Sequence, residues 1–147
     1  MQKIYKEEFS INRTLFNISI FVTVLAIGMM LTEFFSRGAF PATKIGVFYI
    51  GVLMIYSFHK EALRWISKAT DKEIMRRGEY FVYFWIVLTA VLYLVNFLTK
   101  DYFVTGNMGQ ELTALSEISF TALEVCAVFI FARIFKIIFN LLYQKRK

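Results

Sequence analysis

Four long apolar stretches alternate with short polar segments along the chain. The stretches cover roughly Leu15–Phe35, Ile45–Trp65, Phe81–Leu98 and Ile118–Leu142. Each is close to the ~20 residues that a helix needs to cross ~30 Å of hydrocarbon. The pattern therefore predicts an all-α polytopic membrane protein, with four transmembrane helices in an antiparallel bundle that forms one membrane domain over residues 1–147.

The composition agrees with this fold class. Hydrophobic residues make up 58% of the 147 residues, and the mean hydropathy is +0.55. Such values are typical of a polytopic membrane protein and not of a soluble domain. Because four spans use more than half of the chain, any activity must lie among the helices or at the two membrane surfaces.

The distribution of positive charge predicts the orientation. Thirteen of the 17 Lys and Arg residues lie in the N-terminal tail, the second connection or the C-terminal end, whereas three lie in the other two connections. Short loops rich in Lys and Arg stay on the cytoplasmic side. We therefore expect a multi-pass protein of the plasma (inner) membrane, with both termini in the cytoplasm.

The second connection, over about 66–80, holds a dense group of cations. Two interpretations remain open: a solvated helical turn, or a docking surface for anionic lipid or a partner protein. The segment Thr70–Glu73 fits a capping box and predicts a short helix there. The candidate lipid or partner face consists of Arg64, Lys68, Lys72, Arg76 and Arg77.

Polar residues inside the spans are the first place to look for chemistry, because lipid penalises them. Glu124 lies in the fourth stretch, and Tyr93 and Asn96 of the third reach a similar depth. With Thr121 they form the candidate intramembrane polar site. One interpretation is a carboxyl group that hydrogen-bonds Tyr93 or Asn96 and holds helices together, worth about 0.6–2 kcal/mol. The other is a proton or cation site in a transport path.

Several other chemistries find no support in the sequence. Cys126 is the only cysteine and His59 the only histidine, so neither an internal disulfide nor a Cys/His metal site is expected. We predict no cofactor, and the membrane topology accounts for the net charge of +6 without a nucleic-acid partner. Ala42 and Gly46 have a spacing that favours close helix contact. We find no internal repeat.

The segments His59–Trp65 and Arg77–Val82 carry a family resemblance. Together they resemble uncharacterised small multi-span membrane proteins of reduced-genome bacteria, over about the middle third of the chain. The resemblance implies a membrane protein and no particular activity. Small multidrug transporters are similar in span count, but their acid lies in the first helix, where this chain has Ser19 and Thr23. The motifs of the glutathione-linked membrane enzymes and of the quinone-linked thiol oxidases are absent.

These observations predict a non-catalytic accessory or assembly protein whose basic cytoplasmic face contacts lipid or a partner. The alternative is a small proton- or ion-coupled transporter or channel subunit centred on Glu124. An enzyme comes third. The expected partners are the lipid bilayer and a membrane protein, a cytoplasmic protein or further copies of the chain.

Overall fold

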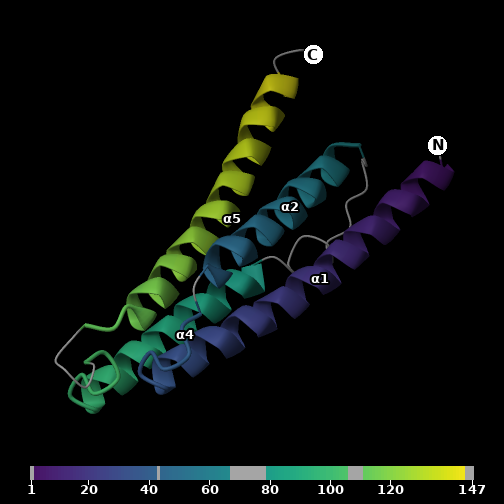
Figure 1. The fold of residues 1–147 in the computed structure, drawn as a ribbon. Coiled ribbons are helices and arrows are strands. Elements are labelled where there is room, and N and C mark those ends of the chain that lie inside the picture. Colours follow the sequence, from purple (N-terminus) through teal and green to yellow (C-terminus); the bar gives the residue numbers. More distant parts are fainter. Residues whose placement is uncertain (1, 43, 67–78, 106–110, 145–147) are drawn as a thin grey trace.

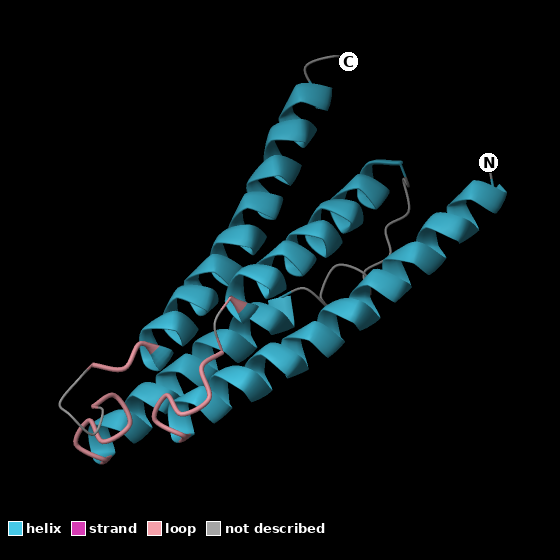
Figure 2. Ribbon diagram, in the orientation of Figure 1, coloured by secondary structure: helices cyan, strands magenta, loops and turns pink. Residues whose placement is uncertain are grey.

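The computed structural model describes residues 2–42, 44–66, 79–105 and 111–144. These residues form four helices, which confirms the all-helical fold (Figure 2). Their bounds are Gln2–Phe35 for α1, Ile45–Ile66 for α2, Glu79–Leu98 for α4 and Ala114–Gln144 for α5. The first helix thus begins well before the apolar stretch that predicted it.

Successive helices run in opposite directions (Figure 1). Both termini lie at one end of the molecule, and the connections that follow α1 and α4 lie at the other end. Helix α1 packs mainly against α2, α2 also packs against α5, and α5 also packs against α4. Toward the termini, α1 and α5 extend beyond the start of α4 and diverge.

Three of the described helices are long and apolar enough to cross a membrane. Their candidate spans are Ser10–Phe35, Tyr80–Leu98 and Ala114–Phe135, which is compatible with a membrane protein. Helix α2 is different because its apolar run, Ile45–Phe58, is roughly 21 Å long at 1.5 Å per residue. The polar segment His59–Glu61 follows directly, so a fourth span remains a prediction.

Helix α1 ends in a Schellman motif. The Gly38 amide donates to the Glu33 carbonyl (2.9 Å), and the Arg37 amide donates to the Phe34 carbonyl (3.2 Å). Arg37 adopts the left-handed conformation, with φ of 56°, as the residue just past a helix in this motif does. Its positive charge there opposes the negative end of the helix dipole.

Helix α4 ends in the same way. The Asp101 amide donates to the Asn96 carbonyl (3.0 Å), the Lys100 amide donates to the Phe97 carbonyl (3.1 Å), and φ of Lys100 is 53°. Segments 33–38 and 96–101 read EFFSRG and NFLTKD. This shared pattern is hard to see in the sequence. Only Phe34 and Phe97 are identical, and four further positions match in the kind of residue alone.

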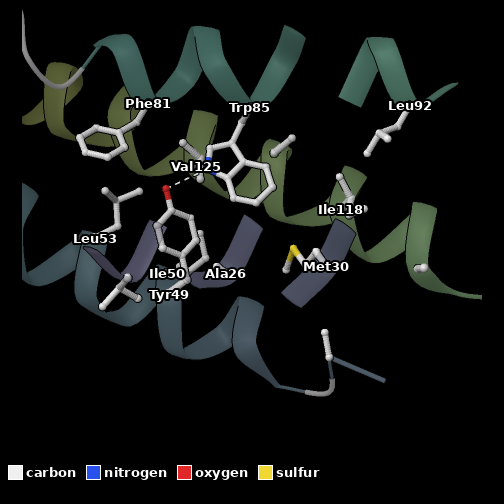
Figure 3. Close-up of a cluster of buried hydrophobic side chains, with 14 of the residues drawn as sticks. Ala26, Met30, Tyr49, Ile50, Leu53, Phe81, Trp85, Leu92, Ile118 and Val125 are labelled. Atoms are coloured by element: carbon white, nitrogen blue, oxygen red, sulfur yellow. Dashed lines mark hydrogen bonds between the residues drawn. The ribbon is translucent and has the colours of Figure 1, made fainter. Parts of the chain in front are cut away.

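One aromatic ring from each helix meets in a layer inside the protein. Phe16 of α1 lies 5.7 Å from Tyr56 of α2 and 6.3 Å from Phe81 of α4, between ring centroids. Phe129 of α5 lies 6.5 Å from Phe81. This aromatic layer closes the terminal end of a buried core that continues toward the connections through residues such as Trp85 (Figure 3).

Candidate functional site

Glu124 lies on the outer face of α5. Its side chain is exposed, and it makes no hydrogen bond or ion pair with another described residue. The apolar side chains around it are exposed as well: Phe120 by 64%, Leu123 by 65% and Phe131 by 59%. An ionisable residue at the centre of a transmembrane helix costs about 2.5–3.5 kcal/mol on insertion scales. Glu124 therefore occupies an energetically unfavourable position unless a neighbour covers it.

The predicted partners of Glu124 bond elsewhere. The Ser119 hydroxyl donates to the Tyr93 hydroxyl (3.0 Å), which joins α5 to α4. The buried Asn96 amide donates to the Asp101 carboxylate (2.7 Å) at the end of α4. The hydrogen bonds that we expected from Glu124 to Tyr93 or Asn96 are therefore not formed. Glu124 follows Ser119 by five positions, which turns it about 140° away around the helix at 3.6 residues per turn.

Thr121, the fourth predicted site residue, is a packing residue. Its side chain is 3% exposed and faces Gly46 of α2. A Cβ atom added at Gly46 would lie 3.0 Å from Thr121 Oγ1 and 3.3 Å from the terminal methyl of Met30 in α1. The absence of a side chain at Gly46 thus allows α1, α2 and α5 to meet, and the close helix contact that we predicted at Gly46 is confirmed.

The candidate lipid or partner face lies largely outside the described residues. Helix α2 ends at Ile66 and α4 begins at Glu79, and the short helix predicted from Thr70 falls between them. Arg64 belongs to the last turn of α2. The face itself remains a prediction, together with the orientation that the charges indicate. The remaining members that fall outside the described residues are Lys68, Lys72, Arg76 and Arg77.

A polar layer lies one helical turn from the aromatic layer, on the side of the termini. Asn12 of α1 precedes Phe16 by one turn, and Lys60 of α2 follows Tyr56 by one turn. Both are buried, with exposures of 8% and 4%, and the Lys60 ammonium lies 5.8 Å from the centre of the Tyr56 ring. The other buried polar residues of this layer are Ser57 and Glu61.

The spacing of residues along α2 indicates this layer in the sequence. Leu53, Tyr56, Ser57, Lys60 and Glu61 follow the i, i+3, i+4, i+7, i+8 pattern of one helix face, and all five are buried. The inner stripe of α2 therefore continues past its apolar run into polar residues.

A chain of hydrogen bonds crosses the centre of the protein. The indole N–H of Trp85 in α4 donates to the Tyr49 hydroxyl in α2 (2.9 Å; Figure 3). The side chains of Tyr49 and Thr23 of α1 are hydrogen-bonded, and the Thr23 hydroxyl donates to the Ser19 carbonyl (2.6 Å). This chain links three helices, and its side chains are all buried. Such bonds stabilise helix contacts where water is excluded.

A second polar group fastens the connection between α1 and α2. Glu33 is 7% exposed, and its Oε2 atom accepts a hydrogen bond from the Ala42 amide (2.9 Å). Arg37 donates to the Thr105 carbonyl, and its guanidinium lies 4.3 Å from the centre of the Tyr102 ring. These contacts join the connection after α1 to the connection after α4.

Replacing Glu33 with leucine should destabilise the protein by about 1.5–3 kcal/mol, because the buried Ala42 amide would lose a charged acceptor. Glu33→Gln should cost less, since its side-chain carbonyl can still accept this bond. Thermal unfolding in detergent micelles, followed by circular dichroism, measures both. A Gln variant as unstable as the Leu variant would show that the carboxylate acts through its charge and not through this hydrogen bond.

Comparison with known proteins identifies no relative. No protein-family model, no curated protein and no solved structure matches the chain. The resemblance carried by His59–Trp65 and Arg77–Val82 remains a prediction.

Proposed function

We propose that this protein is a non-catalytic accessory or assembly protein of a bacterial-type plasma membrane. In this proposal it crosses the membrane four times as a helical bundle, and both termini are cytoplasmic. One observation supports it above the others. The interior hydrogen bonds of Trp85, Asn96 and Glu33 tie helices and connections to one another. Polar residues that form such bonds stabilise the fold, so in this proposal the function lies on the outer surfaces.

The second part of the proposal concerns the cytoplasmic surface. Its cations lie along the segment from Arg64 to Arg77, which follows α2 in the sequence. The end of α2 lies at the end of the molecule where α1 begins and α5 ends. Each Lys or Arg near an anionic leaflet contributes about 1 kcal/mol of attraction. This face is the proposed contact for anionic lipid or for an acidic segment of a partner.

A small proton- or ion-coupled transporter or channel subunit is the second candidate. Glu124 would be the ion-binding group in that case. Its position on the outer face of α5 favours contact with a neighbouring protein over a path through the interior of a single chain. A transport role would therefore require Glu124 to face another subunit.

Two measurements test the proposal. Native electrophoresis after mild solubilisation should show a complex larger than the free protein, and the triple variant Arg64→Gln, Arg76→Gln, Arg77→Gln should lose it. The matched control, Lys44→Gln with Lys100→Gln, removes charge from the opposite end and should retain the complex. Proton or cation flux into liposomes that contain the purified protein should equal that of empty liposomes. Flux that disappears in Glu124→Gln would overturn the proposal in favour of the transporter.

A further inference from the structure

The outer face of α5 carries a carboxyl group at mid-membrane depth. Glu124 lies in the candidate span Ala114–Phe135, ~15 Å along the helix from Ala114 at 1.5 Å per residue. That distance is about half of a ~30 Å hydrocarbon core. Phe120 and Phe131 are exposed on the same face, one and two turns from the carboxyl group. Glu124 is thus a single acid set into an apolar, outward-facing surface.

An acid in this position indicates that another protein packs over it. Ionisable side chains inside membranes face a protein interior or a water-filled cavity, where they pair with other polar groups. The buried Glu33 follows this rule, because its carboxylate accepts the Ala42 amide. Glu124 has no hydrogen-bond partner among the described residues. The described part of the chain thus offers Glu124 no polar partner, and we look for that partner on another molecule.

The described residues of a second copy do not provide that group. Copies inserted with the same orientation place their Glu124 carboxyls at the same depth, so acid would meet acid. On α5 the nearest described cation, Arg133, lies nine positions further along, ~14 Å away along the axis. Arg13 lies near the start of the candidate span of α1, whereas Arg37, Lys44 and Lys100 lie outside the helices, next to their ends. Lys60 of α2 is buried, and its ammonium lies beside the Tyr56 ring.

We propose that the outer face of α5, centred on Glu124, docks a transmembrane helix of another protein that presents a Lys or Arg at mid-membrane depth. Charge complementarity supports this partner. The Glu124 carboxylate requires a cation at its own depth, and the surrounding Phe120, Leu123 and Phe131 offer an apolar surface for the rest of that helix. Exclusion of water by these side chains strengthens the ion pair. The inference rests on the proposed accessory role and names the chemistry of its membrane partner.

A synthetic helix provides the probe. A peptide of about 20 Leu and Ala residues, with one Lys at its centre, is placed in liposomes with the full-length protein, and energy transfer between labels at their termini reports binding. We expect binding about tenfold tighter than that of the same peptide with a central Leu. A peptide whose Lys lies at one end should bind no better than the Leu peptide. Glu124→Leu should abolish the preference for the central Lys.

The controls separate docking from folding. Glu124→Leu should leave helix content and thermal unfolding unchanged or improved, since Glu124 contacts no described polar group. Glu117→Gln changes an acid seven residues away on the same side of α5 and should leave the central-Lys preference intact. Its Oε1 atom already accepts a bond from Thr113 (3.4 Å).

Three results would contradict the proposal that this face docks a helix of another protein. They are a wild-type protein with no preference for the central-Lys peptide, an equal preference in Glu124→Leu, and energy transfer between two copies of the protein that depends on Glu124. The last result would assign the face to self-association. In each case the proposed accessory role would still stand if neutralising Arg64, Arg76 and Arg77 disassembles the native complex.

Discussion

Gly46→Leu should destabilise the protein by about 3 kcal/mol or more, near or above the upper end of the usual cost of overpacking. A Cβ atom at this position already meets Thr121 Oγ1 at 3.0 Å and the Met30 methyl at 3.3 Å. Both neighbours are 3% exposed, so neither side chain has free space into which it can withdraw. The remaining leucine atoms would separate α2 from α1 and α5. The midpoint of thermal unfolding in detergent measures this loss.

Gly51→Leu is the matched control, because it makes the same change on the same helix. No atom lies within 4 Å of the position that a Cβ at Gly51 would occupy. The substitution should fall within about 0.5 kcal/mol of the wild type, as surface changes do, or stabilise slightly through the higher helix propensity of leucine. Equal destabilisation at both positions would show that the backbone freedom of glycine matters here and that packing does not.

The helices that most closely match the sequence prediction are the two whose ends coincide with a change in polarity. Helix α2 (Ile45–Ile66) and helix α4 (Glu79–Leu98) begin and end within two residues of the predicted stretches. Helix α1 begins at Gln2, far before the predicted Leu15. Hydropathy marks where a helix meets lipid, whereas backbone hydrogen bonding decides where the helix ends. Polar turns continue the helix without leaving a signal in hydropathy.

Depth could be predicted along each helix, but rotation about the helix axis could not. The rise of 1.5 Å per residue places Tyr93 and the residues around Glu124 at comparable levels, and the contact of Tyr93 with Ser119 agrees. Which side of α5 faces inward depends on how all the helices pack. Ile118 and Val125 occupy the core, with exposures of 1% and 0%. Burying Val125 keeps the adjacent Glu124 on the outside.

The contact of Glu33 with Ala42 could not be predicted from the sequence, for a different reason. Its partner is the backbone amide of Ala42, and every residue except proline carries such an amide. No side-chain pattern distinguishes Ala42 from its neighbours. The contact arises because the Schellman turn after α1 brings the connection back over the helix end. Its prediction requires the turn geometry, which depends on Arg37 in a left-handed conformation that most residues avoid.

Trp85→Ala should be the second severe substitution, with a loss of about 3–5 kcal/mol. Trp85 is fully buried, and its ring lies 5.5 Å from that of Tyr49 between centroids. Removing the indole leaves a cavity in the buried core and also removes the donor to the Tyr49 hydroxyl. Tyr83→Ala, on the same helix at 60% exposure, is the control and should change the unfolding midpoint far less.

A double-mutant cycle separates the hydrogen bond from the volume of the ring. Trp85→Phe and Tyr49→Phe each remove one partner, and the double variant removes both while retaining aromatic packing. We expect a coupling energy of about 0.6–1.7 kcal/mol, as measured for polar pairs between transmembrane helices. A coupling of zero would mean that Trp85 stabilises α2 and α4 through packing alone. The hydrogen bond from Trp85 to Tyr49 would then contribute nothing to stability beyond the packing of the two rings.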